Sequence, residues 1–321
     1  MKTDFSSHRR SSNKEMTSIA DREVIKMTSS IDKPSLPIEL SRIPASHLSN
    51  TPTSSPLFRL YLAVCANNLK DAEKWLEIGV NPNDTLVINK KITIPLFKAV
   101  RNNNVEMIKL LIKYKSEMDV IDEREISPLM IAAYNGFSEA FFTLLNAGAS
   151  YEDHDNKDIK DLHPDIPGRT LIASIRGGSF DIFQALVERD IDIHSYITLP
   201  VDEVIGCECC KNIENYANTF KKKHYFKTNP LIACATYNRV EMAKLLLSLG
   251  VNVNATSYEG GSPLCQAAEH GYVQMTELLL SYGALLNQFL TKDHKRYRPM
   301  EIAAQNRHHD VFQVLIQHNS I

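Results

Sequence analysis

The amino-acid sequence predicts an all-α solenoid of about seven helix-turn-helix repeats, joined by hairpin fingers and stacked through a shared core. Three observations lead to this fold class. A short proline-containing motif recurs along the chain. A helix-breaking residue lies eight residues after the proline position of each copy, and a second helix-breaking residue lies twenty residues after it. A single helix pair cannot bury its own apolar face, so neighbouring pairs are expected to stack.

The repeated motif is a proline and a leucine or methionine, followed by small residues two to four positions further on. Clear copies begin at Pro95, Pro128, Pro230, Pro263 and Pro299, and copies without the proline begin at Arg59 and Thr170. Successive spacings are 36, 33, 42, 60, 33 and 36 residues, which indicates a base period of 33 with insertions. Proline suits the first turn of a helix, where its missing N–H would have no partner. Ser127, Asn229 and Ser262 precede it as expected N-caps.

Two further positions in each repeat are expected to end its helices. The first is Asn67, Asn103, Gly136, Gly178, Asn238, Gly271 or Arg307. The second is Gly79, Lys115, Gly148, Asp190, Gly250, Gly283 or Asn319. Glycine and asparagine tolerate the left-handed conformation that ends many helices, so Arg307 is an exception at the first position. Between the two breaks the second helix carries an apolar stripe, as in residues 240–247.

These features together resemble the ankyrin repeat, whose signature is T-P-L-H-x-A. The sequences Gly-Val-Asn-Pro-Asn at 79–83 and Gly-Val-Asn-Val-Asn at 250–254 are similar to the Gly-Ala-Asp-Val-Asn that leaves each ankyrin repeat. The resemblance covers residues 56–321, although the signature histidine is replaced in every copy. It implies a non-catalytic scaffold or adaptor that needs no cofactor and binds another protein on a concave surface of fingers and first helices.

The repeats divide the chain into four parts. Residues 1–55 are rich in Ser and Thr and are expected to be mostly disordered. Residues 56–194 hold repeats one to four, and residues 229–321 hold repeats five to seven. Between them, residues 195–228 are expected to form a helical insertion, because the spacing of 60 exceeds the base period of 33 by 27 residues. Insertions in solenoids leave as loops on one face, which is often the binding face.

The resemblance also implies which residues contact a partner. In the family, partners lie on the finger tips and on the outward positions of the first helices. The finger-tip candidates are Lys90, Lys91, Arg124, Tyr258, Glu259, Arg296 and Tyr297. The first-helix candidates are Tyr134 and Arg176, in a row with Lys98, Arg101, Thr236, Glu269 and Gln305. Tyr and Arg are the side chains that most often dominate the binding energy of an interface.

The insertion is the basis of an alternative function, in which the Cys-rich segment binds a metal or performs catalysis. Cys207 and Cys210 have the C-x-x-C spacing that can hold one zinc ion, with His224 as a further donor. A structural zinc site needs four ligands, and a second pair is missing, so no metal site is predicted. No catalytic motif is evident, and the chain is expected not to be an enzyme. A self-associating structural unit is a third hypothesis.

Composition restricts the partners and the location. The net charge of −2 and a pI of about 6.6 argue against a dedicated nucleic-acid binder. No apolar run is long enough to span a membrane. Three scattered and three clustered cysteines in a chain of 321 residues do not suggest a disulfide framework, so a reducing compartment, the cytosol or the nucleus, is expected, with a cytoplasmic location preferred. The chain is also expected to be monomeric. The degenerate repeats are similar in style to ankyrin effectors of intracellular bacteria, which act in the host cytosol, and a eukaryotic or viral adaptor is the open alternative.

Overall fold

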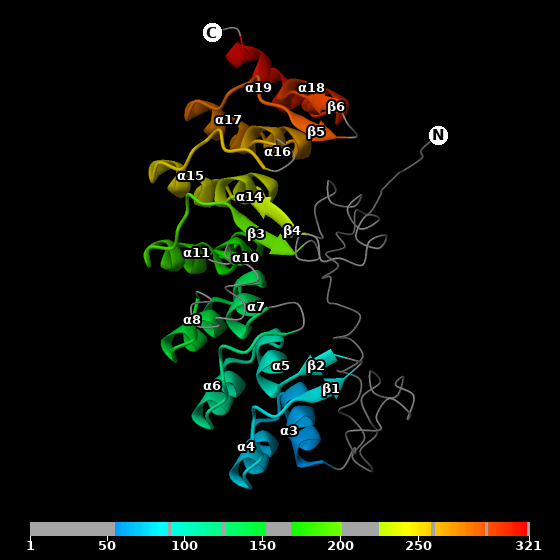
Figure 1. Ribbon diagram of the computed structural model, residues 1–321, viewed down its shortest axis with the longest axis vertical. Helices are drawn as coiled ribbons and strands as arrows, with labels where there is room; N and C mark the ends of the chain where they lie inside the picture. The colour runs from blue at the N-terminus through cyan, green and yellow to red at the C-terminus, as the bar shows by residue number, and fades with distance from the viewer. Residues whose placement is uncertain are drawn as a thin grey trace, which may run out of the picture.

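The computed structural model describes residues 55–88, 91–122, 126–151, 168–200, 225–257, 261–292 and 295–319. Within these residues the helices form seven antiparallel pairs that stack along one long axis, from α3 and α4 at one end to α18 and α19 at the other (Figure 1). The seven-repeat, all-α prediction is therefore confirmed.

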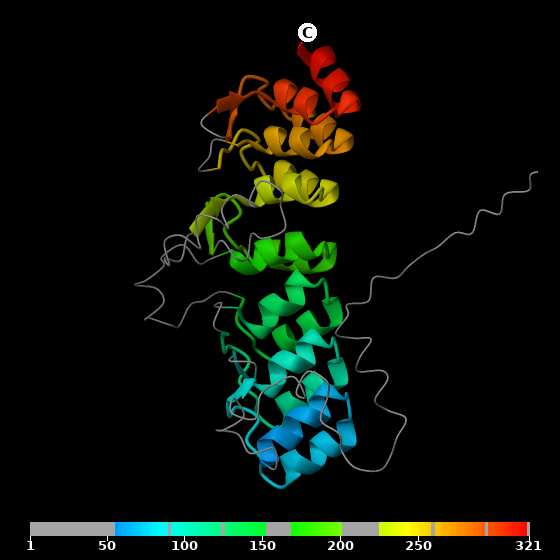
Figure 2. The same cartoon turned by 90° about the vertical axis from the view of Figure 1, so that its right-hand side faces the viewer.

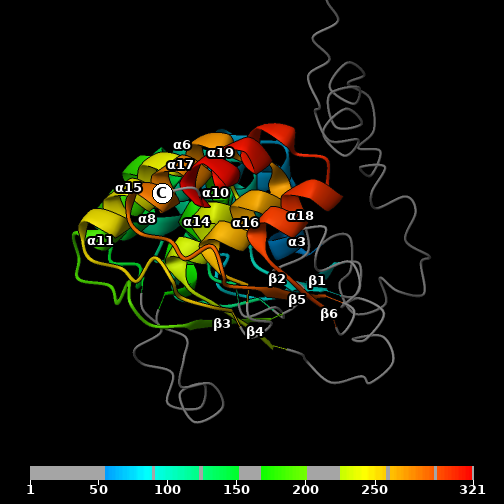
Figure 3. The ribbon, with the colours of Figure 1, turned by 90° about the horizontal axis from the view of Figure 1, so that it is seen from above.

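The first helices of the pairs contact one another in one row, and the second helices form a second row (Figure 3). The first helices are α3 (Pro56–Cys65), α5 (Pro95–Arg101), α7 (Pro128–Tyr134), α10 (Arg169–Gly177), α14 (Pro230–Thr236), α16 (Pro263–His270) and α18 (Pro299–Gln305). The second helices are α4 (Leu69–Glu77), α6 (Val105–Lys113), α8 (Ser138–Asn146), α11 (Phe180–Val187), α15 (Val240–Ser248), α17 (Val273–Ser281) and α19 (His309–Asn319).

The N-caps predicted before the prolines are confirmed. Ser127 Oγ accepts a hydrogen bond from the Met130 N–H at 3.2 Å, and Ser262 Oγ accepts one from the Cys265 N–H at 3.3 Å. The side chain of Asn229 accepts from two N–H groups of the first turn of α14. Each cap satisfies backbone donors that would otherwise have no partner inside the helix, which typically stabilises a helix by about 1 kcal/mol.

The helix breaks also lie where the sequence places them. All seven residues at the first break have a positive φ, between 51° and 79°. Arg307 takes this conformation as well, with φ at 60°, although a non-glycine residue there carries strain of about 1–2 kcal/mol. The His308 N–H that follows it donates to the Ala303 carbonyl at 2.9 Å. Closing the turn between α18 and α19 therefore outweighs the local preference of arginine.

Hairpin fingers form three of the connections between successive repeats and lie beside the first helices (Figure 2). They are β1 (Leu86–Ile88) with β2 (Lys91–Thr93), β3 (Ile197–Pro200) with β4 (Tyr225–Thr228), and β5 (Leu290–Lys292) with β6 (Lys295–Tyr297). All three pairs are antiparallel, and in each the second strand ends two residues before the residue that begins the next helix. The fingers predicted from the repeat pattern are thus confirmed at these places.

The helical insertion predicted over 195–228 is tested only at its two ends, and there the structure differs. Residues 197–200 and 225–228 are strands, with Ile197 opposite Thr228 and Pro200 opposite Tyr225. β-branched and aromatic residues at both ends favour such pairing over a helix. Repeats with a plain hairpin have a spacing of 36, so a spacing of 60 leaves 24 extra residues in this finger. Residues 201–224, between the strands, lie outside the described residues.

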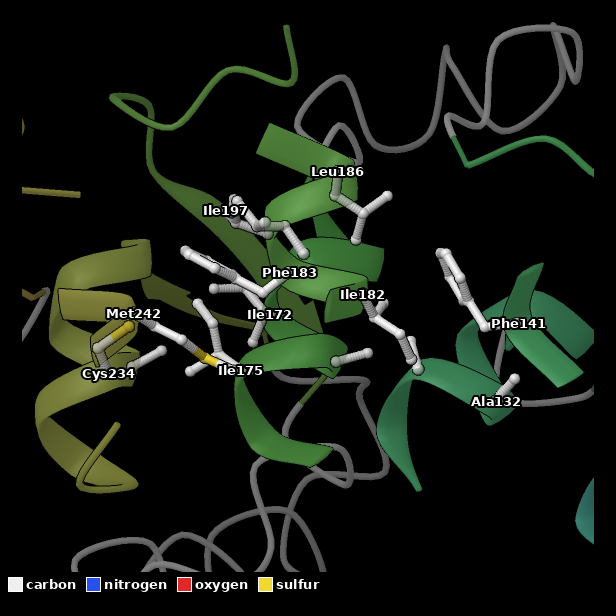
Figure 4. Packing of buried hydrophobic residues seen from close by; sticks show 14 of the residues in the cluster. Ala132, Phe141, Ile172, Ile175, Ile182, Phe183, Leu186, Ile197, Cys234 and Met242 are labelled. Carbon is white, nitrogen blue, oxygen red and sulfur yellow. The ribbon is translucent and has the colours of Figure 1, made fainter. Parts of the chain in front are cut away.

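The core runs without a break past this insertion (Figure 4). Phe183 of repeat four is fully buried, as are Phe141 of repeat three and Cys234 of repeat five. Ile197 of β3 is fully buried in the same cluster. Helices α10 and α14 contact each other, as do α11 and α15. The extra residues extend the β3–β4 finger and do not separate the helices, so repeats one to seven form one stack.

Candidate functional site

One row of side chains follows the C-terminal ends of the first helices. We call it the first-helix row, and its members occupy the sixth position after the proline position: Cys65, Arg101, Tyr134, Arg176, Thr236, Glu269 and Gln305. All seven are exposed or half-buried, whereas the two residues before each of them are buried in repeats one to six. The row therefore lies at the surface of the stack, although the helices that carry it are mostly buried.

A cation lies between two aromatic rings in the middle of this row. The guanidinium carbon of Arg176 is 4.3 Å from the ring centroid of Tyr134 and 5.9 Å from that of Tyr237. The three side chains come from three successive repeats: Tyr134 ends α7, Arg176 lies in the last turn of α10, and Tyr237 is the C-cap of α14. A cation–π contact at a partly exposed site contributes about 0.5–1 kcal/mol. We call these three residues the Tyr-Arg-Tyr stack.

A glycine lets α7 and α10 approach closely enough to form the stack. A Cβ on Gly177 would lie 2.2 Å from the carbonyl oxygen of Ala133 and 2.9 Å from that of Tyr134. Gly177 has an ordinary helical conformation, so space, and not a special φ, requires glycine here. The backbone of Tyr134 and the residue after Arg176 are thereby in direct contact.

Arg239 joins α10 to the following repeat. Its Nε donates to the Ile175 carbonyl at 2.9 Å, and its Nη2 donates to the Arg176 carbonyl at 2.8 Å. Both carbonyls belong to the last turn of α10, where four carbonyls have no partner within the helix. The guanidinium packs against Gly178, where a Cβ would lie 2.6 Å from its central carbon. Repeats four and five are therefore connected directly behind Arg176.

Three more of the predicted contact residues already have structural partners. Arg101 forms an ion pair with Asp122 at 3.2 Å and lies over the Phe97 ring at 5.7 Å. Tyr297 is half-buried and packs against the core cluster. Arg296, its neighbour in β6, is exposed and lies over the ring of Phe289 at 4.3 Å.

The remaining candidates lie mostly outside the described residues. This holds for Lys90, Arg124, Tyr258, Glu259, Cys207, Cys210 and His224, and for the side chain of Lys91. Tyr237, in contrast, is described but was missed by the sequence-based selection. It lies one position beyond the first-helix row, and its ring lies 5.9 Å from the guanidinium carbon of Arg176.

No three His, Cys, Asp or Glu side chains in the described part of the chain come close enough to hold a metal ion. The described cysteines, Cys65, Cys234 and Cys265, are free thiols. Burial raises the pKa of the Cys234 and Cys265 thiols, which keeps both protonated and weakly nucleophilic. Among the helices of the described segments, none combines the length and apolarity that crossing a bilayer requires.

Comparison with known sequences identifies the repeat. The sequence profile described as ankyrin repeats (3 copies) matches residues 60–158, 96–197, 203–290 and 258–321. A curated relative, the ankyrin repeat protein FPV222 of Fowlpox virus (strain NVSL), is 29% identical over 76 residues. These residues make up 24% of this chain and 10% of the viral protein, so the match spans about a tenth of that relative's length.

Solved structures agree on the fold. The human ASB11 ankyrin repeat domain superposes with a TM-score of 0.58 over 81% of this chain and 96% of its own, at 20% identity. The ankyrin repeat domain of Bcl-3, a member of the IkappaB protein family, gives a TM-score of 0.52 over 79% of this chain and 97% of its own, also at 20% identity. At this identity the likeness concerns the arrangement of helices and fingers.

Proposed function

Because the chain belongs to the ankyrin-repeat family, we propose that it is a non-catalytic interaction module that binds a partner protein across its first-helix row. Ankyrin repeats in general are protein–protein interaction modules, and their stacked repeats form extended binding surfaces. The effector role, the cytoplasmic location and the monomeric state stay predictions from the sequence.

The observation that carries this proposal is the Tyr-Arg-Tyr stack. Its residue types are those that most often dominate interface energetics. Tyr134 is 40% exposed, which leaves a large part of its ring for a partner to cover. The ring contacts hold the long side chain of Arg176 in one place, so less conformational entropy is lost when a partner binds. Three successive repeats contribute to it, as expected for a surface that acts across repeats.

The proposal is tested by comparing capture profiles of three full-length proteins on beads, exposed to the same cell lysate and measured by quantitative mass spectrometry. The first is the wild type and the second is Tyr134→Ala/Arg176→Ala. The third, Lys74→Gln/Lys244→Gln, changes exposed residues of the second helices and serves as the matched control. We expect specific partners to be lost from the first variant and retained by the control.

Amide hydrogen exchange then locates the contact with a captured partner. Protection is expected in α7, α10 and the turn after α14, where the stack lies. If the Tyr134/Arg176 variant captures the same proteins in the same amounts as the wild type, the first-helix row is not the binding surface and the proposal is wrong.

A further inference from the structure

The hairpin β5–β6 near the C-terminal end of the stack carries a group of cations. Lys295, Arg296 and Arg298 are all exposed, and we call them the basic finger. These three cations lie within four consecutive residues, so like charges stand close together and repel one another. Within the described residues, no ion pair involves the side chains of the basic finger. An acid supplied from outside would relieve this repulsion.

The core fixes the position of this finger. Leu290 is 5% exposed and pairs across the hairpin with Tyr297, which packs on the core. Glu301 accepts a hydrogen bond from the backbone N–H of Arg298 at 2.9 Å, which ties the end of the finger to the first turn of α18. The cations therefore lie on an ordered element that holds them at a defined place.

Arg296 is presented differently from the two other cations. Its guanidinium carbon lies 4.3 Å from the centroid of the Phe289 ring. A guanidinium that contacts a ring by one face keeps its N–H groups directed outward in its own plane, where a carboxylate can accept two parallel hydrogen bonds. The ring of Phe289 thus pre-orients a group that binds carboxylates in a bidentate manner.

The other finger with described side chains at the equivalent place is apolar. Ile92 stands three residues before Pro95, as Arg296 stands three before Pro299. Ile92 pairs with Val87 across the β1–β2 hairpin, and the two are 53% and 49% exposed. The same position therefore carries a hydrocarbon in the first finger and a cation in the last, so the repeat by itself does not require a charge there.

We propose that the basic finger binds an acidic segment of the partner protein, a run of Asp and Glu side chains in which one carboxylate is held by Arg296. This inference rests on the proposed function and adds the chemistry of the partner. A protein segment suits the site better than a polyanion such as nucleic acid, because the chain as a whole has a net charge of −2 and the basic finger spans only four residues.

The test uses the full-length chain and a fluorescein-labelled peptide of alternating Glu and Ser, with binding followed by fluorescence anisotropy. The same peptide with Gln in place of Glu measures binding that does not need charge. We expect Arg296→Gln/Arg298→Gln to weaken binding of the Glu peptide about tenfold or more, and added salt to weaken it as well. The control Lys74→Gln/Lys244→Gln also removes two positive charges and is expected to leave binding unchanged.

Two conservative variants test whether the basic finger forms a defined carboxylate-binding site or attracts acidic peptides through its positive charge alone. Arg296→Lys keeps the positive charge but removes the planar guanidinium, which can donate two parallel hydrogen bonds. Phe289→Leu keeps every charge but removes the aromatic ring that the Arg296 guanidinium contacts. Both are expected to weaken the Glu peptide several-fold while the far-UV circular dichroism stays that of the wild type. Unchanged binding by both would overturn the proposal, because charge alone would then explain it.

Competition identifies the class of occupant. Single-stranded RNA and anionic lipid vesicles are added to the complex with the labelled Glu peptide. If either displaces the peptide at lower concentration than unlabelled Glu peptide does, the acidic-protein assignment is wrong. If the acidic-segment proposal fails, the capture experiment on Tyr134 and Arg176 still tests the proposed function, because the two experiments change different elements and use different readouts.

Discussion

Replacing Arg239 with alanine should weaken the connection between repeats four and five. The side chain donates two hydrogen bonds, at 2.9 and 2.8 Å, to the last turn of α10. Hydrogen bonds from a charged donor contribute about 1.5–3 kcal/mol each, and the lower value applies because Arg239 is partly exposed. The change should therefore lower the free energy of unfolding by about 3 kcal/mol.

In a repeat protein this loss changes cooperativity as well as stability. Solenoid stability is approximately a sum of repeat and nearest-neighbour interface contributions, so a weakened interface lets the two sides unfold more independently. The single tryptophan, Trp75, lies in α4 of repeat one and packs against the core. Its fluorescence reports on the N-terminal repeats, whereas far-UV circular dichroism reports on all helices. In urea titrations of Arg239→Ala, we expect the midpoints of the two signals to move apart.

The matched control is His308→Ala. His308 occupies the same position in repeat seven as Arg239 does in repeat five, and its Nε2 lies 3.0 Å from the Glu269 carbonyl oxygen. This variant loses one contact, at the last interface, so the Trp75 transition should not shift. A change below about 0.5 kcal/mol for Arg239→Ala, with midpoints that still coincide as in the wild type, would refute the reasoning.

Three further predictions concern packing, capping and thiols. Gly177→Ala should destabilise by about 1–3 kcal/mol because its Cβ meets the Ala133 carbonyl, whereas Gly250→Ala, whose Cβ meets nothing but whose φ is 81°, measures the cost of backbone strain alone; thermal unfolding compares them. Ser127→Ala should lower the free energy of unfolding by about 1 kcal/mol through the lost cap, and a urea titration with no shift would contradict this. Burial raises the pKa of Cys234, so the unfolded thiol ionises first, and stability should fall as pH rises above about 8.5. This decline, followed by urea titrations from pH 8 to about 9.5, should be shallower in Cys234→Ala, and equal slopes would exclude the thiol as its cause.

Local signals account for the parts of the structure that the sequence predicts well. A cap such as Ser127 and the proline after it act within one helical turn, so a short motif is enough to place the start of a helix. The breaks act in the same way, through residues that tolerate a positive φ. Arg307 shows the limit of this reasoning, because its position in the repeat predicted its conformation and its residue type did not.

The candidate site was predictable only in part. The repeat register placed Tyr134 and Arg176 in one row, and the structure brings their side chains together. Tyr237 escaped selection because it stands one position further along its own helix end. The strands that frame the insertion escaped as well, since β3 and β4 pair across 24 intervening residues, and a pattern read over one period does not reveal such a pairing.

The sequence by itself determined the repeat, its helices, their caps and breaks, and hence the ankyrin fold, because each of these depends on residues within one period. Only the tertiary structure decided which side chains form contacts between repeats. Arg239 bonds to carbonyls 63 and 64 residues away, and the Tyr-Arg-Tyr stack joins three helices. Such contacts depend on how closely neighbouring helices approach, as at Gly177, and this distance is set by the packing of the whole stack.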